Sequence, residues 1–423
     1  MSASSVMEME QTHEVIIPRA TWETALRRLL VSPGRWATGR IRTHKTADSM
    51  EWLVDQLELA EEFPDGRTRL SRANWIVVGM LTDDERSPEE ILNRMLLQAT
   101  QQVVVLLFHQ TERGRWSGIV HRNGTLFPMD GVRVIGSGML HLQRNPVAIP
   151  DVPDDGRWSR TIGGLAPSLW QRTRSAHVLL IGCGRNGTMA AWQLAGLGVH
   201  RLTLVDPDKL AIENIEAMPG LEFNDIGKPK TAILGQQLLK QNPDLMLRCF
   251  AYPVSDILDR LKARYDLIVT CVDDDVPRLG ASWLARELLI PHIDVGSSVQ
   301  RSETGETTLA GDVRMLLPHE GCIQCVGGLA DREQTMYEFA APPGSLHRGV
   351  PVEWNQQRAG SLVHLNSMTV GIGVELWLRL LRGEIGSYWQ RLTVRSRAEF
   401  ELTGAAVGAG EQCEFCRDVQ VVE

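Results

Sequence analysis

The sequence has no uninterrupted apolar run of about 18 residues, few aromatic residues and no excess of positive charge. Without such a run, no membrane-spanning helix is expected. The formal net charge of -8 disfavours a nucleic-acid-binding surface. The first ten residues are acidic and lack an apolar centre, so no secretory signal peptide is predicted. We therefore expect a cytoplasmic protein that binds neither a membrane nor a nucleic acid.

Cysteine is also scarce, with 7 in 423 residues, yet four form two Cys-x-x-Cys pairs, Cys322 with Cys325 and Cys413 with Cys416. Two such pairs supply four thiolates, the complete ligand set of a tetrahedral structural Zn²⁺ site. An odd total favours metal-bound thiolates in a reducing compartment over disulfides. Because residues 326–412 separate the pairs, the metal is expected to fasten the chain end to a large domain. The alternative is four buried or unrelated cysteines.

A proline- and aspartate-rich segment, residues 144–156, predicts a linker. Before it we expect a disordered lead-in, residues 1–12, and a non-catalytic α+β domain for partner docking, residues 13–143. The patterns that indicate its elements are helical over 20–30 and 88–101, and β-branched or apolar over 75–81, 103–108 and 132–135.

Residues 157–423 alternate between strand and helix patterns, which predicts an α/β domain with a doubly wound, mostly parallel, Rossmann-like sheet. The expected strands are 178–181, 201–205, 267–271 and 292–295, and the expected helices are 186–195, 230–242, 278–288 and 361–381.

The first of these strands runs into a Gly-x-Gly-x-x-Gly loop formed by Gly182, Gly184 and Gly187. In order, these glycines permit a tight turn, a close approach of phosphate and packing of the helix on the strand. Asp206 ends the next strand, where an acid binds ribose hydroxyls. Alone, this motif fits a nicotinamide dehydrogenase as well as any other nucleotide-binding enzyme.

Further charged residues fall where parallel strands are expected to end. They are Asp208, Lys230, Asp273 and Arg278. Ligands of such sheets bind at the carboxyl ends of the strands. Two cations with carboxylates that could hold Mg²⁺ suit an ATP triphosphate better than a nicotinamide ring.

Residues 157–416 resemble the ThiF/MoeB-type adenylyltransferases of the ubiquitin-activating enzyme superfamily, because their motifs follow one another in the order that is typical of that family. The segment 157–162 stands at the family's opening Arg-aromatic-x-Arg motif, and the glycine loop follows it. The remaining positions that match are Asp206, Asp208, Asn214, Lys230, Asp273 and the two Cys-x-x-Cys pairs.

The resemblance implies ATP-dependent adenylation of the C-terminal carboxylate of a ubiquitin-like or sulfur-carrier protein. Lys230 would contact the phosphates, Asp273 would hold Mg²⁺ and Asp206 would bind the ribose. Asp208 and Asn214 would complete the nucleotide site. Arg160 would serve as an arginine finger delivered across a homodimer interface.

The chain departs from the family at two positions near the phosphates. Arg185 replaces the second glycine of the adjacent Gly-Gly pair in the usual Gly-x-Gly-Gly-x-Gly loop, and Ala217 stands where the family has an arginine. We hypothesise that the changes compensate, so that Arg185 supplies the guanidinium missing at position 217. The alternative is a surface arginine at a helix start.

A third departure concerns the acyl acceptor, because residues 326–360 contain no cysteine. Cys183, Cys249 and Cys271 lie in the loop or the strands and are poor acceptors. Either the adenylate passes directly to a partner, or Ser345, two residues from a histidine, forms an oxyester. The alternative for Ser345 is an ordinary turn residue.

The N-terminal domain faintly resembles a JAB/MPN-type metalloprotease at His109, Trp116 and Ser117. Thr111 stands where the second histidine is needed, so no metal site is expected. The domain is interpreted as an inactive relative used for docking, or as an unrelated α+β domain.

The resulting prediction is a homodimeric enzyme that activates a ubiquitin-like protein for a conjugating enzyme in a bacterial pathway. One alternative is activation of a sulfur-carrier protein for thiamine or molybdopterin synthesis. A second is an inactive partner-binding subunit, suggested by Ala217 and the missing cysteine. A dehydrogenase leaves the zinc-type cysteines unexplained.

Overall fold

The structure is a computed structural model in which two compact units are distinguished: Met1–Ala148 with Lys262–Arg264, and Ile149–Leu261 with Tyr265–Glu423. It describes residues 12–31, 36–46, 49–60, 75–81, 102–109, 116–122, 125–143, 156–216, 218–261, 263–301, 307–340, 362–395, 400–408, 410, 413 and 415. The predicted lead-in and linker lie almost entirely outside these residues.

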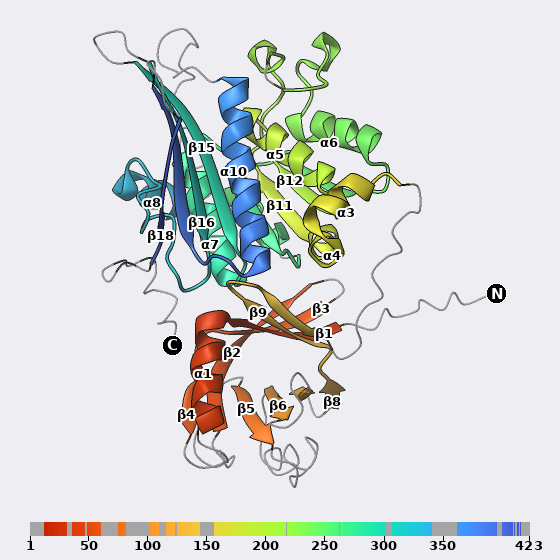
Figure 1. The fold of residues 1–423 in the computed structure, drawn as a ribbon, viewed down its shortest axis with the longest axis vertical. Helices are drawn as coiled ribbons and strands as arrows, with labels where there is room; N and C mark the ends of the chain where they lie inside the picture. The colour runs from red at the N-terminus through yellow and green to blue at the C-terminus, as the bar shows by residue number, and fades with distance from the viewer. Residues whose placement is uncertain are drawn as a thin grey trace, which may run out of the picture. The chain divides into compact units, whose positions relative to one another are not determined.

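The first unit is built on a mixed sheet with the strand order β10-β9-β1-β3-β2-β5-β6-β7-β8, and β4 pairs with β2 (Figure 1). β1 runs parallel to both of its neighbours, β3 and β9. Its elements are β1 (Thr12–Pro18), α1 (Arg19–Val31), β2 (Trp36–Lys45), β3 (Ser49–Val54), β4 (Glu58–Ala60), β5 (Trp75–Leu81), β6 (Val103–His109), β7 (Trp116–Arg122), β8 (Thr125–Pro128), β9 (Gly131–Ile135) and β10 (Leu140–Gln143). The predicted helix 20–30 and the three predicted strands are confirmed, whereas 88–101 lies outside the described residues.

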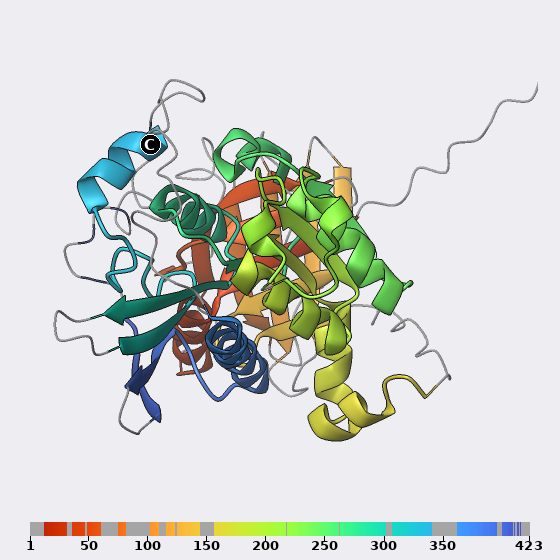
Figure 2. The ribbon, with the colours of Figure 1, turned by 90° about the horizontal axis from the view of Figure 1, so that it is seen from above.

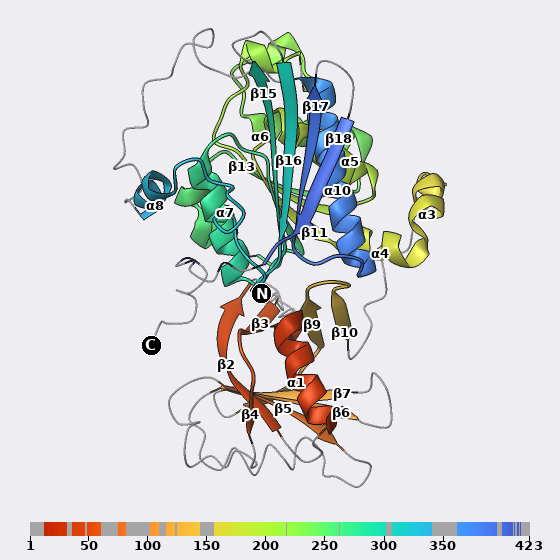
Figure 3. The ribbon, with the colours of Figure 1, turned by 60° about the vertical axis from the view of Figure 1, so that its left-hand side comes forward.

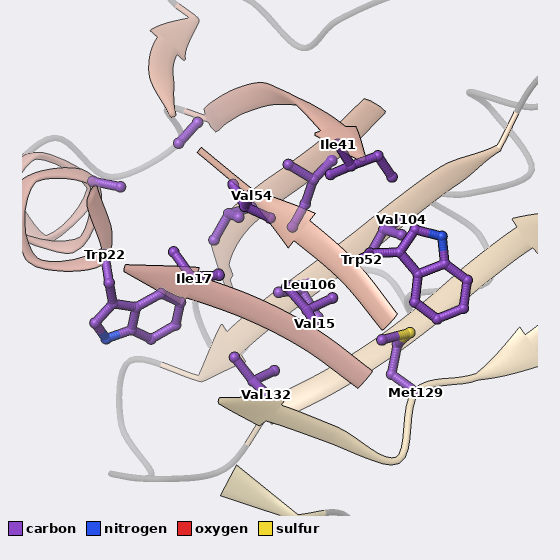
Figure 4. Close-up of a cluster of buried hydrophobic side chains, with 14 of the residues drawn as sticks. Val15, Ile17, Trp22, Ile41, Trp52, Val54, Val104, Leu106, Met129 and Val132 are labelled. Atoms are coloured by element: carbon purple, nitrogen blue, oxygen red, sulfur yellow. The ribbon is translucent and has the colours of Figure 1, made fainter. Parts of the chain in front are cut away.

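The core of this unit forms between α1 and the sheet. Trp22, Ala25 and Leu29 recur at helical spacing and are buried against the strands. The Trp22 ring meets Phe108 edge-on, with ring centroids 4.9 Å apart. Figure 4 shows Trp22 directed toward the strand that carries Ile17. One face of α1 therefore contributes to the hydrophobic core of this unit.

The second unit contains a sheet with the order β13-β12-β11-β14-β15-β16-β17-β18. The strands from β13 to β15 are parallel, and β16, β17 and β18 continue the sheet as antiparallel neighbours. The strands are β11 (His177–Ile181), β12 (Arg201–Val205), β13 (Met246–Phe250), β14 (Leu267–Thr270), β15 (His292–Arg301), β16 (Thr307–Leu316), β17 (Tyr388–Arg395) and β18 (Phe400–Ala406). The predicted doubly wound parallel sheet is confirmed, and the antiparallel extension is an addition to it.

Helices cover both faces of this sheet. The α-helices are α3 (Ser159–Leu165), α4 (Pro167–Ser175), α5 (Arg185–Gly196), α6 (Lys230–Gln241), α7 (Asp275–Glu287), α8 (Arg332–Ala340) and α10 (Val363–Arg382). Short 3-10 turns are η1 (Ile212–Asn214), η2 (Phe223–Asp225), η3 (Val254–Asp256) and η4 (Leu258–Leu261). Helix α10 packs on α5 and β16, whereas α7 lies on the opposite face (Figure 3). This placement follows from right-handed crossovers, because β11-α5-β12 and β14-α7-β15 progress in opposite directions along the sheet.

The four predicted helices of this unit differ from their predicted bounds by one to three residues, and for two of them the end has a local cause. Helix α7 begins at Asp275, three residues before the predicted 278, because the Asp274 carboxylate caps it by accepting the Val276 N–H at 3.0 Å. Pro277 is tolerated because first-turn N–H groups have no partner within the helix. Helix α10 ends at Arg382, because the next residue, Gly383, has a φ of 83° and caps it in the left-handed region. Among the described residues, no helix is long and apolar enough to cross a membrane.

Candidate nucleotide-binding site

The parallel half of the second unit has a switch point between β11 and β14. From β11 the chain moves to β12 on one side, and from β14 it moves to β15 on the other. At this point, the loops after neighbouring strands diverge and leave a crevice at the carboxyl ends. The loop 182–187 follows β11, and the loop 271–274 follows β14. The motifs predicted to bind nucleotide thus stand at the expected edge.

The glycine loop is tight enough to require glycine at two positions. Gly182 has a φ of 92°, and a Cβ there would lie 2.5 Å from the carbonyl oxygen of Cys271. A Cβ on Gly187 would lie 1.8 Å from the carbonyl oxygen of Gly182. At Gly184, which caps α5, a Cβ would meet no atom within 4 Å, so this side of the helix N-terminus is open.

Asp206 fastens this loop to the end of β12. Its Oδ2 accepts the backbone N–H of Cys183 at 2.6 Å, and its Oδ1 accepts that of Asp208 at 2.8 Å. The side chain is buried, and burial raises the pKa of the Asp206 carboxyl despite the nearby Lys230. Each carboxylate oxygen keeps further acceptor capacity that ribose hydroxyls could use.

Lys230 and Asp208 meet although 22 positions separate them in the chain. The Lys230 N–H donates to the Asp208 carbonyl at 3.0 Å, and its Nζ donates to Oδ2 of Asp208 at 2.8 Å. Burial disfavours the ammonium, but the carboxylates of Asp206, Asp208 and Asp273 outweigh this and raise the pKa of Lys230. The lysine is therefore a persistent cation at the start of α6.

Asp273 lies exposed after β14, in a loop that a buried ionic network holds. Arg278 donates to the Val272 carbonyl at 2.8 Å, and its Nε lies 3.3 Å from Oδ1 of Asp294. Asp294 is fully buried and also accepts from Arg314 at 3.0 Å. Arg278 was expected to face the ligand, but its guanidinium is turned to Val272, Asp275 and Asp294.

His292 sits beside this network without a charge. Its Nε2 lies 2.8 Å from the hydroxyl of Thr270, which also donates to Asp294 at 2.8 Å. Burial lowers the pKa of His292 to about 4, although the Asp294 carboxylate acts in the opposite direction. The histidine is therefore neutral near pH 7.

Arg185 occupies the first position of α5, beside the phosphate-type loop. Its Nη2 donates to the Glu216 carboxylate at 2.6 Å and to the Glu213 carbonyl at 3.0 Å. The guanidinium is thus directed to the turn that leads to position 217. Ala217 itself lies outside the described residues.

Asn214 and Arg160 were predicted to belong to the same site. The Asn214 side-chain oxygen accepts the Ala211 N–H at 2.9 Å, so it closes the η1 turn. Arg160 is exposed on α3, a helix that buries none of its own residues. Helix α3 stands at the outer edge of the second unit in two views (Figures 2 and 3). Trp158 anchors its start against Trp170.

Three of the four predicted metal ligands come together away from the nucleotide loop. The Cys322 sulfur lies 3.7 Å from that of Cys325 and 3.6 Å from that of Cys413. A tetrahedral Zn²⁺ with bonds of about 2.3 Å places its sulfurs about 3.8 Å apart, whereas a disulfide needs about 2.05 Å. The cluster fits Zn²⁺ on both spacing and donor chemistry. Cys416 lies outside the described residues.

The other cysteines are poor nucleophiles in this fold. Burial raises the pKa of the Cys183 and Cys271 thiols far above their usual range. Cys249 is exposed as a residue, but its thiol donates to the Thr231 carbonyl at 3.4 Å, and local desolvation raises its pKa to about 11. A thiol with such a pKa contributes almost no thiolate near neutral pH. Ser345, the predicted oxyester candidate, lies outside the described residues.

A glycine loop at a switch point, a persistent cation and two exposed carboxylates define a nucleotide-binding α/β protein of the doubly wound class. Residues 158–368 match the model of the ThiF family. Over 258 residues the chain is 29% identical to the sulfur carrier protein ThiS adenylyltransferase of Escherichia coli, covering 59% of this chain and 95% of that protein.

A second relative is the ATP-dependent ubiquitin transferase-like protein Cap2 of Enterobacter hormaechei, 33% identical over 128 residues. That match spans 28% of this chain and 21% of Cap2. Among solved structures, the chain is similar to MccB of E. coli, with 17% identity and a TM-score of 0.48. The match covers 64% of this chain and 76% of MccB. Through residues 158–368 the chain belongs to the ThiF family, and its class is that of the adenylyltransferases.

Proposed function

We propose that this protein uses ATP and Mg²⁺ to adenylate the C-terminal carboxylate of a small ubiquitin-like protein. A carboxylate oxygen attacks the α-phosphorus, the bond to the β-phosphate oxygen breaks, and pyrophosphate leaves. The observation that carries the proposal is the Lys230 ammonium, held 2.8 Å from Asp208 at the switch point and acted on by Asp206 and Asp273.

The reaction brings a carboxylate to a triphosphate, so catalysis depends on neutralising negative charge. Lys230 would contact phosphate oxygens, and exposed Asp273 would hold Mg²⁺ opposite it. Gly182, Gly184 and Gly187 would let phosphate approach the N-terminus of α5. Asp206 would bind the ribose, with Asp208 and Asn214 shaping its surroundings. Arg160, exposed on α3, would reach the phosphates of a second copy in a homodimer.

The fate of the adenylate is the finer part of the proposal. We favour transfer to a conjugating enzyme in a bacterial, cytoplasmic ubiquitin-like pathway, which the name of Cap2 supports. The match along 95% of ThiS adenylyltransferase supports the alternative, activation of a sulfur carrier. The raised pKa values of Cys183, Cys249 and Cys271 favour direct transfer from the adenylate over a thioester on those residues.

ATP–pyrophosphate exchange tests adenylation, measured with ubiquitin-like and sulfur-carrier proteins added separately. We expect exchange with one carrier, lost when its C-terminal residue is removed. Exchange should be about 100-fold slower in Asp273→Asn, because a metal ligand is missing. Asp259→Asn, an exposed carboxylate on η4, is the matched control and should exchange normally. Exchange that survives Asp273→Asn would refute the metal role, and no exchange with any carrier would favour the inactive-subunit alternative.

We also propose that Cys322, Cys325, Cys413 and Cys416 bind one structural Zn²⁺. The metal would hold the chain end that follows β18 beside the turn after β16. Metal analysis should find about one zinc per chain, reduced in Cys413→Ser. Cys249→Ser, outside the cluster, should keep its zinc, and a chain purified without zinc would refute the site.

A further inference from the structure

The nucleotide site contains two cations that share one arrangement. The Lys230 side chain is 12% exposed and is paired with Asp208, which is 63% exposed. The Arg185 side chain is 14% exposed and is paired with Glu216, which is 72% exposed. In both pairs the cation lies inside, and the carboxylate covers it from the solvent side.

Arg185 is placed where a guanidinium needs a compensating anion. It stands at the first position of α5, with Gly184 as the N-cap. The N-terminus of a helix carries a partial positive charge, so a cation there is unfavourable and an anion is favourable. Glu216 supplies that anion across the loop at 2.6 Å. A phosphate group would interact with the same guanidinium and with the N-terminus of α5 together.

We propose that Glu216 is a placeholder anion: it holds Arg185 at the phosphate end of the site and is displaced from the guanidinium when the triphosphate binds. The inference rests on the proposed ATP site and assigns a positioning role to Glu216, which is not one of the positions that match the family. It also gives Arg185 two partners in succession, a carboxylate in the empty site and phosphate oxygens in the occupied one.

The displacement is energetically feasible because the pair is held weakly from the solvent side. An ion pair with an exposed partner is weakened by solvent, whereas a triphosphate offers the guanidinium several anionic oxygens that it can bind bidentately. Phosphate oxygens should therefore replace the Glu216 carboxylate as the partner of the Arg185 guanidinium. After the exchange Glu216 is free to turn into water, and the Glu213 carbonyl, 3.0 Å from Arg185, still limits where the guanidinium can move.

Binding of Mg·ATP, measured by titration calorimetry, tests the role of Glu216. Glu216→Gln should bind Mg·ATP about two- to fivefold more tightly than the wild type, because the competing charge is gone. Arg185→Gln should bind it about 10- to 100-fold more weakly. In the double variant, Glu216→Gln should add nothing to Arg185→Gln. Glu213→Gln is the matched control, since only its backbone carbonyl accepts from Arg185, and it should match the wild type.

Whether Glu216→Gln strengthens or weakens Mg·ATP binding distinguishes the placeholder role from a purely structural ion pair. If Arg185 and Glu216 only join α5 to the η1 turn, Glu216→Gln should weaken binding of Mg·ATP and of adenosine alike. In the placeholder role, adenosine, which has no phosphate, binds Glu216→Gln as it binds the wild type. Weaker Mg·ATP binding by Glu216→Gln, or wild-type affinity in Arg185→Gln, would overturn the inference. Wild-type protein that binds no ATP would instead refute the proposed function, and the placeholder role with it.

Discussion

The sheet of the second unit has a parallel half and an antiparallel half that differ in burial and in chemistry. Strands β11, β12 and β14 are almost wholly buried between helices, whereas β18 is exposed along its entire length. Parallel strands bring all their carboxyl ends to one edge, so the residues that follow them collect there. Antiparallel strands alternate in direction and share no such edge. Strand direction therefore accounts for the gathering of Asp206, Lys230 and Asp273 on one side.

The largest expected difference between the halves lies in their ion pairs. Asp294 is fully buried in the parallel half, between Arg278 and Arg314, and Asp294→Ala would leave both cations without their shared anion. We expect this variant to lose about 3–5 kcal/mol of unfolding free energy in urea titrations. In the antiparallel half, Arg395 and Glu401 are 4.0 Å apart and largely exposed. Glu401→Gln should therefore stay within about 0.5 kcal/mol of the wild type. Equal losses would show that burial does not set the difference.

The buried histidine should give the parallel half a distinct pH dependence. The pKa of His292 is lowered from 6.5 to about 4 in the folded chain, chiefly by burial. Between these values the unfolded chain binds a proton that the folded chain does not, so stability is full above pH 6.5 and falls toward pH 4. The loss should approach about 3 kcal/mol.

Urea titrations between pH 7 and 4.5 test this contribution. His292→Gln should reduce the slope of the unfolding free energy against pH by the amount that corresponds to about one bound proton. His364→Gln, at an exposed position on α10, should keep the wild-type slope. An unchanged slope in His292→Gln would mean that other groups cause the decline.

A smaller but localised effect is expected at the glycine loop. Gly182→Ala would place a Cβ 2.5 Å from the Cys271 carbonyl oxygen at a φ of 92°. The strain and the clash should cost about 2–3 kcal/mol, with a parallel loss of ATP affinity. Gly408, just after β18, has no atom within 4 Å of its added Cβ, so Gly408→Ala is the matched control. Similar losses of unfolding free energy in Gly182→Ala and Gly408→Ala would contradict the prediction that the loop is too tight for a Cβ at position 182.

The two halves also differ in how far the sequence predicts them. Apolar strands such as Leu267–Thr270 stand out because both of their faces are buried. The glycine motif identifies the loop, and the strand ends correctly place Lys230 and Asp208 together. Strands β17 and β18 lack a continuous apolar run, since polar residues such as Arg391 and Glu401 interrupt their apolar ones, and they were not predicted. The pairs Arg185–Glu216 and Arg278–Asp294 were missed because they depend on tertiary packing of residues distant in sequence.

The smallest effect on stability is expected on β18, at the end of the antiparallel half. Leu402 is 55% exposed there, so Leu402→Ser should leave the unfolding free energy within about 0.5 kcal/mol of the wild type. Phe400, on the same strand, is also exposed, and among the described residues β18 is the last strand of the sheet, so no described strand pairs with its outer edge. Exposed apolar edge strands promote aggregation, and Leu402→Ser should therefore slow heat-induced aggregation, measured by light scattering. A loss of several kcal/mol in Leu402→Ser would mean instead that β18 is packed as tightly as β12, and the comparison between the two halves would fail.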